Sequence, residues 1–266
     1  MNLAYRYLER ENFDSYEDFC RGLKIKVPES FNFAYDIIDE YARLEPDRKA
    51  LVWCDDHGDE KTFTFTDLRK WSSKTANYLK SLGIRKGDRV MLILRRRYEF
   101  YFFALALCRI GAIYIPCTHQ LKEKDIVYRA NAAGAKMIVA YPCDGLIDSV
   151  EQALDKSPTV EKLVMVGGKR SGWLCYDEDI ESFPEEFPRP EGDEAPKNDD
   201  LMIIYFTSGT TSMPKMACHD FTYPLGHIVT AKYWQRVIDY GLHLTVSDSG
   251  WAKFGWGKIY GQWICG

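Results

Sequence analysis

The chain has 266 residues, of which 46% are hydrophobic, so it can bury a sizeable core and form one large domain or two smaller ones. Its formal net charge of -4 gives no broad electrostatic attraction to nucleic acid or to an anionic membrane. We therefore expect no nucleic-acid partner.

Eight cysteines are scattered along the chain without a Cys-x-x-Cys pair, which favours free thiols in a reducing compartment. The first residues, 1–19, lack the apolar core of a signal peptide, so we expect a cytoplasmic protein. One apolar run, residues 100–117, approaches the length of a membrane span. Because Arg109 lies in the run and Gly111 and Pro116 interrupt it, we expect a core helix followed by a strand and no membrane span.

In chain order, the first predicted elements are a helix, a hairpin and a second helix. Apolar residues recur at helical spacing over residues 32–43. Two short apolar runs, residues 50–54 and 61–65, flank a polar turn and predict a two-stranded hairpin. The next helix is predicted to begin at Thr66 as its N-cap and to stop at Gly83.

Strands and helices then alternate. The predicted strands are residues 90–94, 112–115, 137–140 and 163–166, and the predicted helices are residues 98–110, 123–133 and 146–157. This order predicts a parallel sheet with helical crossovers. Arg95, Arg96 and Arg97 follow a strand end, where α/β folds often bind ligands, but the same run is also typical of an exposed helix start.

An acidic, proline-containing connector is predicted over residues 176–200. It separates a first α/β subdomain, residues 1–175, from the start of a second one, residues 201–266. The second subdomain opens with an apolar run, residues 201–206, that is typical of a strand buried on both faces.

The loop after this strand is rich in hydroxyl groups and contains Gly209 and Lys215. Its hydroxyl residues are Thr207, Ser208, Thr210, Thr211 and Ser212. Hydroxyls, free backbone N–H groups and one ammonium suit phosphate oxygens, although such a composition is also common in plain surface turns. The spacing of a Walker P-loop is absent around Gly209, which disfavours an ordinary P-loop nucleotidase.

Residues 205–215 resemble the signature of the adenylate-forming superfamily, which contains acyl-CoA synthetases, adenylation domains of peptide synthetases and luciferases. Residues 63–68 and 107–116 resemble two further core motifs of that superfamily. Ser212 stands where many members have a second glycine. The resemblance implies that the loop binds the ATP phosphates through Thr207, Ser208, Gly209, Thr210, Thr211, Ser212 and Lys215.

Beyond the loop, we predict a helix over residues 223–240 and a strand over residues 243–247. The glycine- and aromatic-rich residues 248–260 follow. Together with the loop and His219, they look most like the acetyl- to medium-chain acyl-CoA synthetase branch. That resemblance implies an acyl pocket lined by Trp251, Ala252, Lys253 and Trp256. Core packing of the tryptophans, solvent exposure of Lys253 and a structural role for His219 remain open alternatives.

The resemblance implies an α/β fold of layered, parallel-rich sheets flanked by helices, which is part of the large N-terminal domain of an adenylate-forming enzyme. We expect a truncated chain, because the catalytic lysine and later motifs of the family fall outside it. The implied activity is that of an AMP-forming acyl-CoA synthetase with ATP, Mg²⁺, CoA and a short- to medium-chain or branched acid. An amino-acid or aryl-acid adenylation domain and a noncatalytic nucleotide-binding module are the alternatives.

Overall fold

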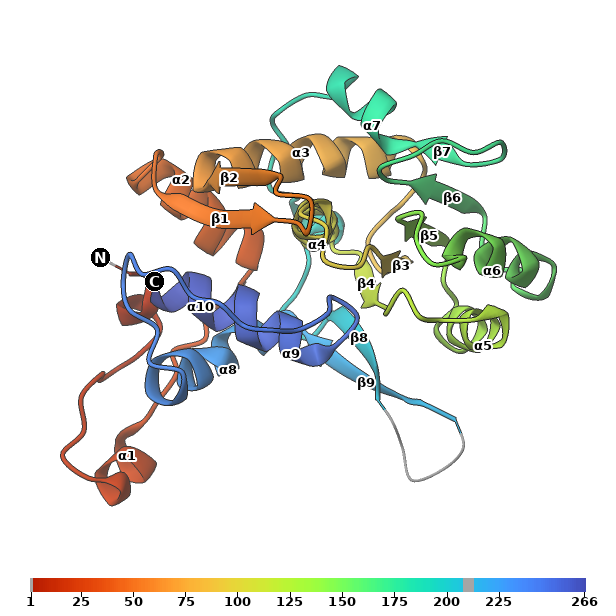
Figure 1. Ribbon diagram of the computed structural model, residues 1–266. Helices are drawn as coiled ribbons and strands as arrows, with labels where there is room; N and C mark the ends of the chain where they lie inside the picture. Colours follow the sequence, from red (N-terminus) through yellow and green to blue (C-terminus); the bar gives the residue numbers. More distant parts are fainter. Residues whose placement is uncertain (1, 208–212) are drawn as a thin grey trace.

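A seven-stranded sheet forms the centre of the computed structural model, which describes residues 2–207 and 213–266 (Figure 1). In spatial order the strands are β7 (Leu174–Cys175), β6 (Lys162–Met165), β5 (Met137–Ala140), β3 (Arg89–Ile93), β4 (Ile113–Pro116), β8 (Leu201–Thr207) and β9 (Lys215–Asp220). Neighbouring strands are parallel except for β8 and β9, which are antiparallel. The predicted parallel-rich α/β fold is confirmed.

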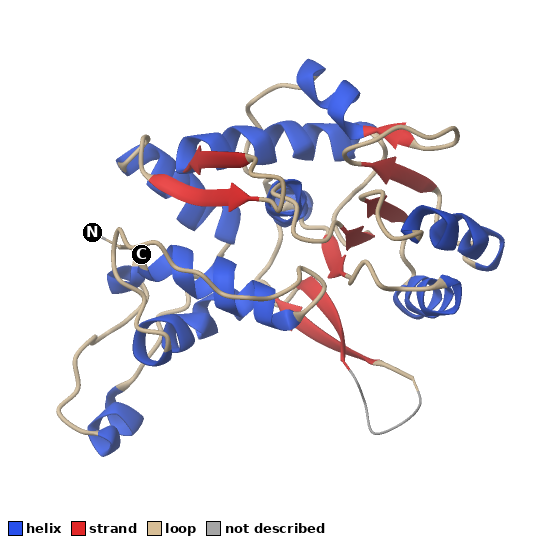
Figure 2. Ribbon diagram, in the orientation of Figure 1, coloured by secondary structure: helices blue, strands red, loops and turns tan. Residues whose placement is uncertain are grey.

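Helices cover both faces of this sheet (Figure 2). The chain passes through α4 (Glu99–Ile110) between β3 and β4, through α5 (Glu123–Ala133) between β4 and β5, and through α6 (Leu146–Ala153) with a 3-10 turn (Leu154–Lys156) between β5 and β6. On β3, Val90 and Leu92 join the core that contains α4. Met91 and Ile93 join the opposite core with α5 and α6. Because alternate side chains of a strand point to opposite faces, the sheet is buried on both sides.

The predicted hairpin and the helix after it are present. Strands β1 (Lys49–Cys54) and β2 (Glu60–Thr64) are antiparallel, and α3 (Phe65–Ser81) follows. The predicted N-cap at Thr66 is wrong, because Thr64 caps the helix. The Thr64 hydroxyl accepts from the Asp67 backbone N–H, and the Asp67 carboxylate accepts from the Thr64 N–H in return. This reciprocal capping box satisfies two N–H groups at once, which Thr66 does not do. Gly83 follows the helix with a φ of +89°, as predicted for a stop.

The N-terminal and connecting segments consist of short elements. They are a 3-10 turn (Ala4–Arg6), α1 (Tyr16–Gly22), a π-helical segment (Ala34–Asp39) that continues into α2 (Glu40–Leu44), α7 (Tyr176–Asp179) and two 3-10 turns (Ile180–Ser182 and Gly192–Glu194). The predicted connector, residues 176–200, is tied to α3 by ion pairs from Lys74 to Glu181 (2.8 Å) and from Lys80 to Glu194 (3.1 Å). The domain boundaries at residues 175 and 200 stay a prediction.

Helix α4 confirms the prediction of a core helix followed by a strand over residues 100–117. Each of its residues is buried, including Arg109, whose exposed fraction is 0%. The Arg109 guanidinium donates to both carboxylate oxygens of Asp39 (2.6 and 2.9 Å) and to the Ser72 hydroxyl (3.0 Å). A buried charge of this kind persists only when it is paired. Across the described ranges, no helix combines the length and the apolar character that crossing a bilayer requires.

The C-terminal part is helical, with one predicted element missing. It contains α8 (Tyr223–Val229), a π-helical segment (Thr230–Trp234), α9 (Ala252–Phe254), a second π-helical segment (Gly255–Ile259) and α10 (Tyr260–Cys265). The first helical stretch ends at Trp234, before the predicted end at residue 240, because Arg236 adopts a left-handed backbone with a φ of +53°. The strand predicted at residues 243–247 is wrong. Leu242, Leu244 and Val246 alternate on the surface, but no described strand pairs with them.

Candidate functional site

Strands β8 and β9 place two of the predicted phosphate-binding residues side by side. Thr207 ends β8 and Lys215 begins β9, and the two are partners in the antiparallel ladder. The Thr207 hydroxyl donates to the Lys215 carbonyl over 3.4 Å. Both residues are exposed. The other predicted loop residues, Ser208, Gly209, Thr210, Thr211 and Ser212, lie outside the described residues, and their assignment stays a prediction.

The strand that carries Thr207 has the burial that its sequence predicted. Met202, Ile203 and Tyr205 join one core, and Ile204 joins the core on the opposite face. By contrast, Lys215 takes part in none of the ion pairs found between described residues. A rigid strand thus ends in a hydroxyl, and an exposed ammonium begins the next strand. This combination suits an anionic ligand with several oxygens.

The carboxyl ends of β3 and β4 lie near these strands in the same sheet, because β4 pairs with β8. The strand order reverses here, because the chain leaves β4 and crosses to the far side of β3 to form β5. Open α/β sheets bind ligands at such switch points. The residues gathered here include His119 after β4 and Asp144 after β5, with 3.6 Å between the His119 Nε2 and an Asp144 carboxylate oxygen. Sequence analysis did not single out either of these residues, and their positions directly after strand ends were the available signal.

The segment before the predicted acyl pocket contacts the residues that follow β3 and β4. An Asp248 carboxylate oxygen lies 3.4 Å from the His119 Nδ1, and the Ser249 hydroxyl donates to the Arg95 carbonyl. At Gly250 the backbone passes so close to the residues after β4 that an added Cβ would lie 2.1 Å from the Thr118 nitrogen. Glycine is therefore required at this position because only it allows the approach. These contacts fix the start of the helical stretch that carries the predicted acyl-pocket residues.

The four predicted acyl-pocket residues lie along one helical stretch. Trp251 precedes α9 and is 62% exposed, Ala252 is half-buried, and Lys253 is exposed, in line with its solvent alternative. Trp256 is half-buried against Trp234, with 5.5 Å between ring centroids. Lys253 and Trp256 are three residues apart and share a helical face. A cavity of about 640 Å³ lies at the same stretch, but other residues line it, among them Lys258 and Gln262. The sequence did not predict this cavity as an acyl-binding site.

Two histidines near β9 have lowered pKa values. Burial lowers the pKa of His219, whose ring packs on Tyr223 at 4.1 Å between centroids. Burial and, to a smaller extent, nearby His219 together lower the pKa of His227 to about 4. The His227 Nδ1 lies 3.3 Å from the Thr230 hydroxyl. These contacts favour the structural alternative for His219.

The lowered pKa of His227 predicts a loss of stability in mild acid. An unfolded histidine binds a proton below about pH 6.5, whereas the folded imidazole resists protonation until about pH 4. The contribution of His227 to stability is therefore complete above pH 6.5 and is lost as the pH falls to 4, by roughly 1–3 kcal/mol. Urea unfolding of wild type and His227→Gln at several pH values measures it. The difference in unfolding free energy between wild type and His227→Gln should shrink as the pH falls. His57→Gln, which changes an exposed histidine, should have the same pH dependence as wild type. Parallel curves for wild type and His227→Gln would contradict the prediction.

No set of three or more His, Cys, Asp or Glu side chains within residues 2–207 and 213–266 is arranged to hold a metal ion. All eight cysteines are free, and they range from exposed to buried. Arg97, from the predicted basic run, forms an ion pair with Glu99 (2.6 Å) and stacks over Tyr141. The positive charge of Arg97 is therefore already paired within the fold.

Comparison with known proteins places this site in context. The model of the family described as "AMP-binding enzyme" matches residues 38–249. Acyl-coenzyme A synthetase ACSM3 of Mus musculus, a mitochondrial protein by name, is 34% identical over 98% of this chain and 46% of its own length. Human ACSM4, also named as a mitochondrial acyl-coenzyme A synthetase, is 36% identical over 90% of this chain and 42% of its own length. The chain therefore spans less than half the length of these relatives.

Two solved structures share the fold. An acyl-CoA synthetase of Brucella canis has a TM-score of 0.78 and 23% identity, and it matches 90% of this chain and 43% of its own. The anthranilate CoA ligase AuaEII, solved with anthranoyl-AMP, has a TM-score of 0.74 and 22% identity, with 90% of this chain and 44% of its own covered. At these identities the likeness supports the fold alone.

Proposed function

The chain belongs to the family of AMP-binding enzymes, and on that premise we propose that it is part of an AMP-forming acyl-CoA synthetase. The observation that carries the proposal is the likeness of nearly the whole chain to proteins named acyl-coenzyme A synthetases. The pairing of Thr207 with Lys215 supports it, because it places a hydroxyl beside a cation at the base of the predicted loop. We propose a short- to medium-chain or branched carboxylic acid as the substrate.

The proposed reaction has two steps. A carboxylate oxygen attacks the α-phosphorus of ATP, the bond to the bridging oxygen breaks, and pyrophosphate leaves with the electron pair. The CoA thiolate then attacks the carbonyl carbon of the acyl adenylate, and the bond to the AMP oxygen breaks, which gives acyl-CoA and AMP. Fixed donors that contact the departing pyrophosphate stabilise the charge that develops on it. In this chain we assign that role to Thr207, Lys215 and the loop between them.

The described residues contain no cluster of side chains that fits a magnesium ion. Magnesium that accompanies ATP is bound largely by substrate phosphates and water. We therefore propose that magnesium enters with ATP and has no ligand among the described residues. ATP and CoA enter as substrates.

We propose a reducing compartment for the protein. The free cysteines support it, since disulfides are rare where thiols are kept reduced. The sequence led us to expect the cytoplasm, whereas the names of the relatives point to the mitochondrion. Fractionation of the source cells would distinguish the two.

Pyrophosphate exchange with a panel of acids tests the proposed activity. The full-length protein should exchange labelled pyrophosphate into ATP only when a suitable carboxylic acid is present. Because one protein of this fold is an anthranilate CoA ligase, the panel should include aryl acids and amino acids beside straight and branched acids. Exchange with amino acids, followed by loading onto a carrier-protein thiol, would favour an adenylation domain. No exchange with any acid would favour a noncatalytic nucleotide-binding module.

The proposed acyl pocket predicts that Trp256 limits chain length. Replacing Trp256 by glycine removes a large aromatic surface, and each methylene that becomes buried contributes about 0.8 kcal/mol. Relative kcat/KM should then rise about fourfold per added carbon while the enlarged cavity stays open. The measurement is kcat/KM for a straight-chain series with the full-length protein. Trp234→Gly is the matched control, because it removes the ring that packs on Trp256 and keeps Trp256 itself. An unchanged length profile in folded Trp256→Gly would show that Trp256 only packs.

A further inference from the structure

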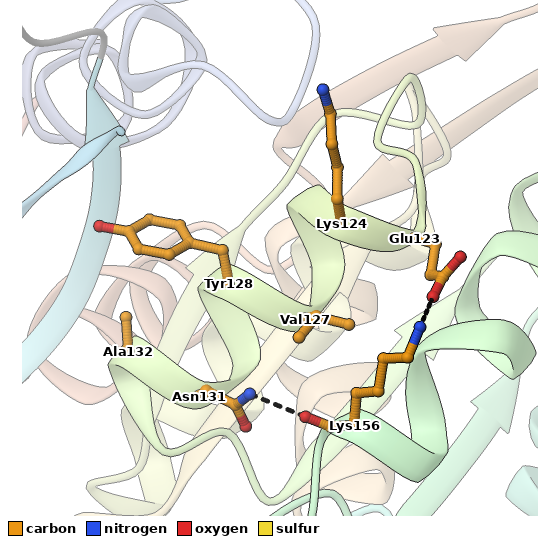
Figure 3. A pocket seen from close by; sticks show the side chains of 7 residues that line it. All are labelled: Glu123, Lys124, Val127, Tyr128, Asn131, Ala132 and Lys156. Atoms are coloured by element: carbon orange, nitrogen blue, oxygen red, sulfur yellow. Dashed lines mark hydrogen bonds and ion pairs between the residues drawn. The ribbon is translucent and has the colours of Figure 1, made fainter. Parts of the chain in front are cut away.

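Helix α5 contacts the base of the predicted phosphate loop on both sides. The Tyr128 hydroxyl donates to the Pro214 carbonyl over 2.7 Å. The Tyr128 ring also meets the Phe206 ring edge to face, with 6.1 Å between centroids. Figure 3 shows the Tyr128 side chain directed away from Lys156 and toward the blue strand beside the helix. One side chain thus contacts the residue before Thr207 and the residue before Lys215.

The next residue of the helix strengthens this attachment. The Arg129 guanidinium lies 5.3 Å from the centre of the Phe206 ring. Its own helix holds it there, because Arg129 donates to the Asp125 carbonyl (3.1 Å). A cation over an aromatic face is attracted by the ring. Two side chains of α5 therefore hold Phe206 of β8 in place.

Helix α5 is a firm support for these contacts. Ile126, Ala130 and Ala133 are buried in the core that α5 shares with the sheet. The described ladder between β8 and β9 ends with the pair Thr207 and Lys215, so Pro214 lies one residue beyond it. The hydrogen bond from Tyr128 therefore holds Pro214 in place just beyond the last described pair of the β8–β9 ladder.

We propose that Tyr128 and Arg129 are positioning residues for adenylation. They fix Phe206 and Pro214, so that the Thr207 hydroxyl and the Lys215 ammonium keep one alignment toward the phosphates of ATP. The proposal rests on the proposed function. Small misplacements of groups that contact a reacting substrate lower the rate strongly. Neither residue touches the substrate itself in this account.

Hydrogen exchange in this chain tests the structural half of the proposal without ATP. Tyr128→Phe keeps the ring against Phe206 and removes only the hydroxyl. Loss of one neutral hydrogen bond should speed amide exchange in residues 213–220 about fivefold and leave the other strands unchanged. Tyr233→Phe is the matched control, since the Tyr233 hydroxyl also donates to a backbone carbonyl, that of Glu11 (3.0 Å). Equal exchange over residues 213–220 in wild type and Tyr128→Phe would overturn the proposal.

Kinetics of the full-length protein test the functional half. In pyrophosphate exchange, Tyr128→Phe should raise the KM for ATP about fivefold at an unchanged KM for the acid. A residue that only maintained the fold would not separate the two KM values, and Tyr233→Phe should change neither. Equal KM values for ATP in active wild type and Tyr128→Phe would overturn the positioning role. An inactive wild type would instead contradict the proposed function, and the exchange rates of residues 213–220 would still decide the structural half.

Discussion

Replacing Lys215 by alanine should lower the adenylation rate of the full-length protein about ten- to a hundredfold and leave its unfolding temperature nearly unchanged. A hydrogen bond to a charged group is worth about 1.5–3 kcal/mol, which converts to this loss of rate. Stability should hold because Lys215 is exposed and joins no ion pair between described residues. Pyrophosphate exchange and thermal unfolding measure the two quantities.

Two further variants sharpen the Lys215 test. Lys162→Ala is the matched control, because Lys162 is also an exposed lysine that begins a strand, far along the sheet at β6. It should change neither rate nor stability. Lys215→Arg keeps the cation and should retain more activity than Lys215→Ala. Equal adenylation rates in wild type and Lys215→Ala would remove Lys215 from the site.

Replacing Arg109 by methionine should cost about 3 kcal/mol or more of stability, the largest such effect that we expect. Arg109 is fully buried, and its loss would remove both hydrogen bonds that its guanidinium donates to the Asp39 carboxylate. Removing one member of a buried ion pair is strongly destabilising, because the other charge stays desolvated. Urea unfolding measures the change. The exposed Arg43, which pairs with Glu40, provides the comparison, and Arg43→Met should cost less than about 1 kcal/mol.

A double variant separates charge from packing at Arg109. Arg109→Met combined with Asp39→Leu removes both charges and should recover much of the lost stability. Asp39 is the suitable partner because its side chain is only 25% exposed. A double variant as unstable as the sum of the single ones would show that Arg109 acts through its packed volume instead.

The alternating part of the fold could be predicted because its signals are local. Strand β5 and helix α5 have the bounds that their apolar patterns predicted. Strand β9 was not predicted, because Lys215–Asp220 mixes charged and apolar residues and owes its state to pairing with β8. At residues 243–247, by contrast, a strand was predicted that the structure does not contain. Leu242, Leu244 and Val246 have a strand pattern, but a strand also needs a neighbour whose backbone accepts its hydrogen bonds.

In the candidate site, too, the sequence indicated some of the residues and not others. Thr207 and Lys215 could be proposed because the loop motif is continuous in sequence, and the structure adds their pairing across β8 and β9. Ser208 to Ser212 lie outside the described residues, so their roles stay predictions. Tyr128 was missed because its partner, Pro214, is 86 residues away in sequence. Contacts at such separation depend on the packing of α5 beside the sheet, which no local pattern encodes.

We propose that the full-length protein joins a carboxylic acid to CoA through an acyl adenylate. The most direct measurement incubates the full-length protein with ATP, CoA, Mg²⁺ and a panel of straight and branched acids, and quantifies acyl-CoA, AMP and pyrophosphate in one reaction by mass spectrometry. We predict equal amounts of the three products with at least one acid and none of them without acid. Without CoA, only the pyrophosphate released with the enzyme-bound adenylate should form. Release of ADP and phosphate, or no acyl-CoA from any acid, would contradict the claim.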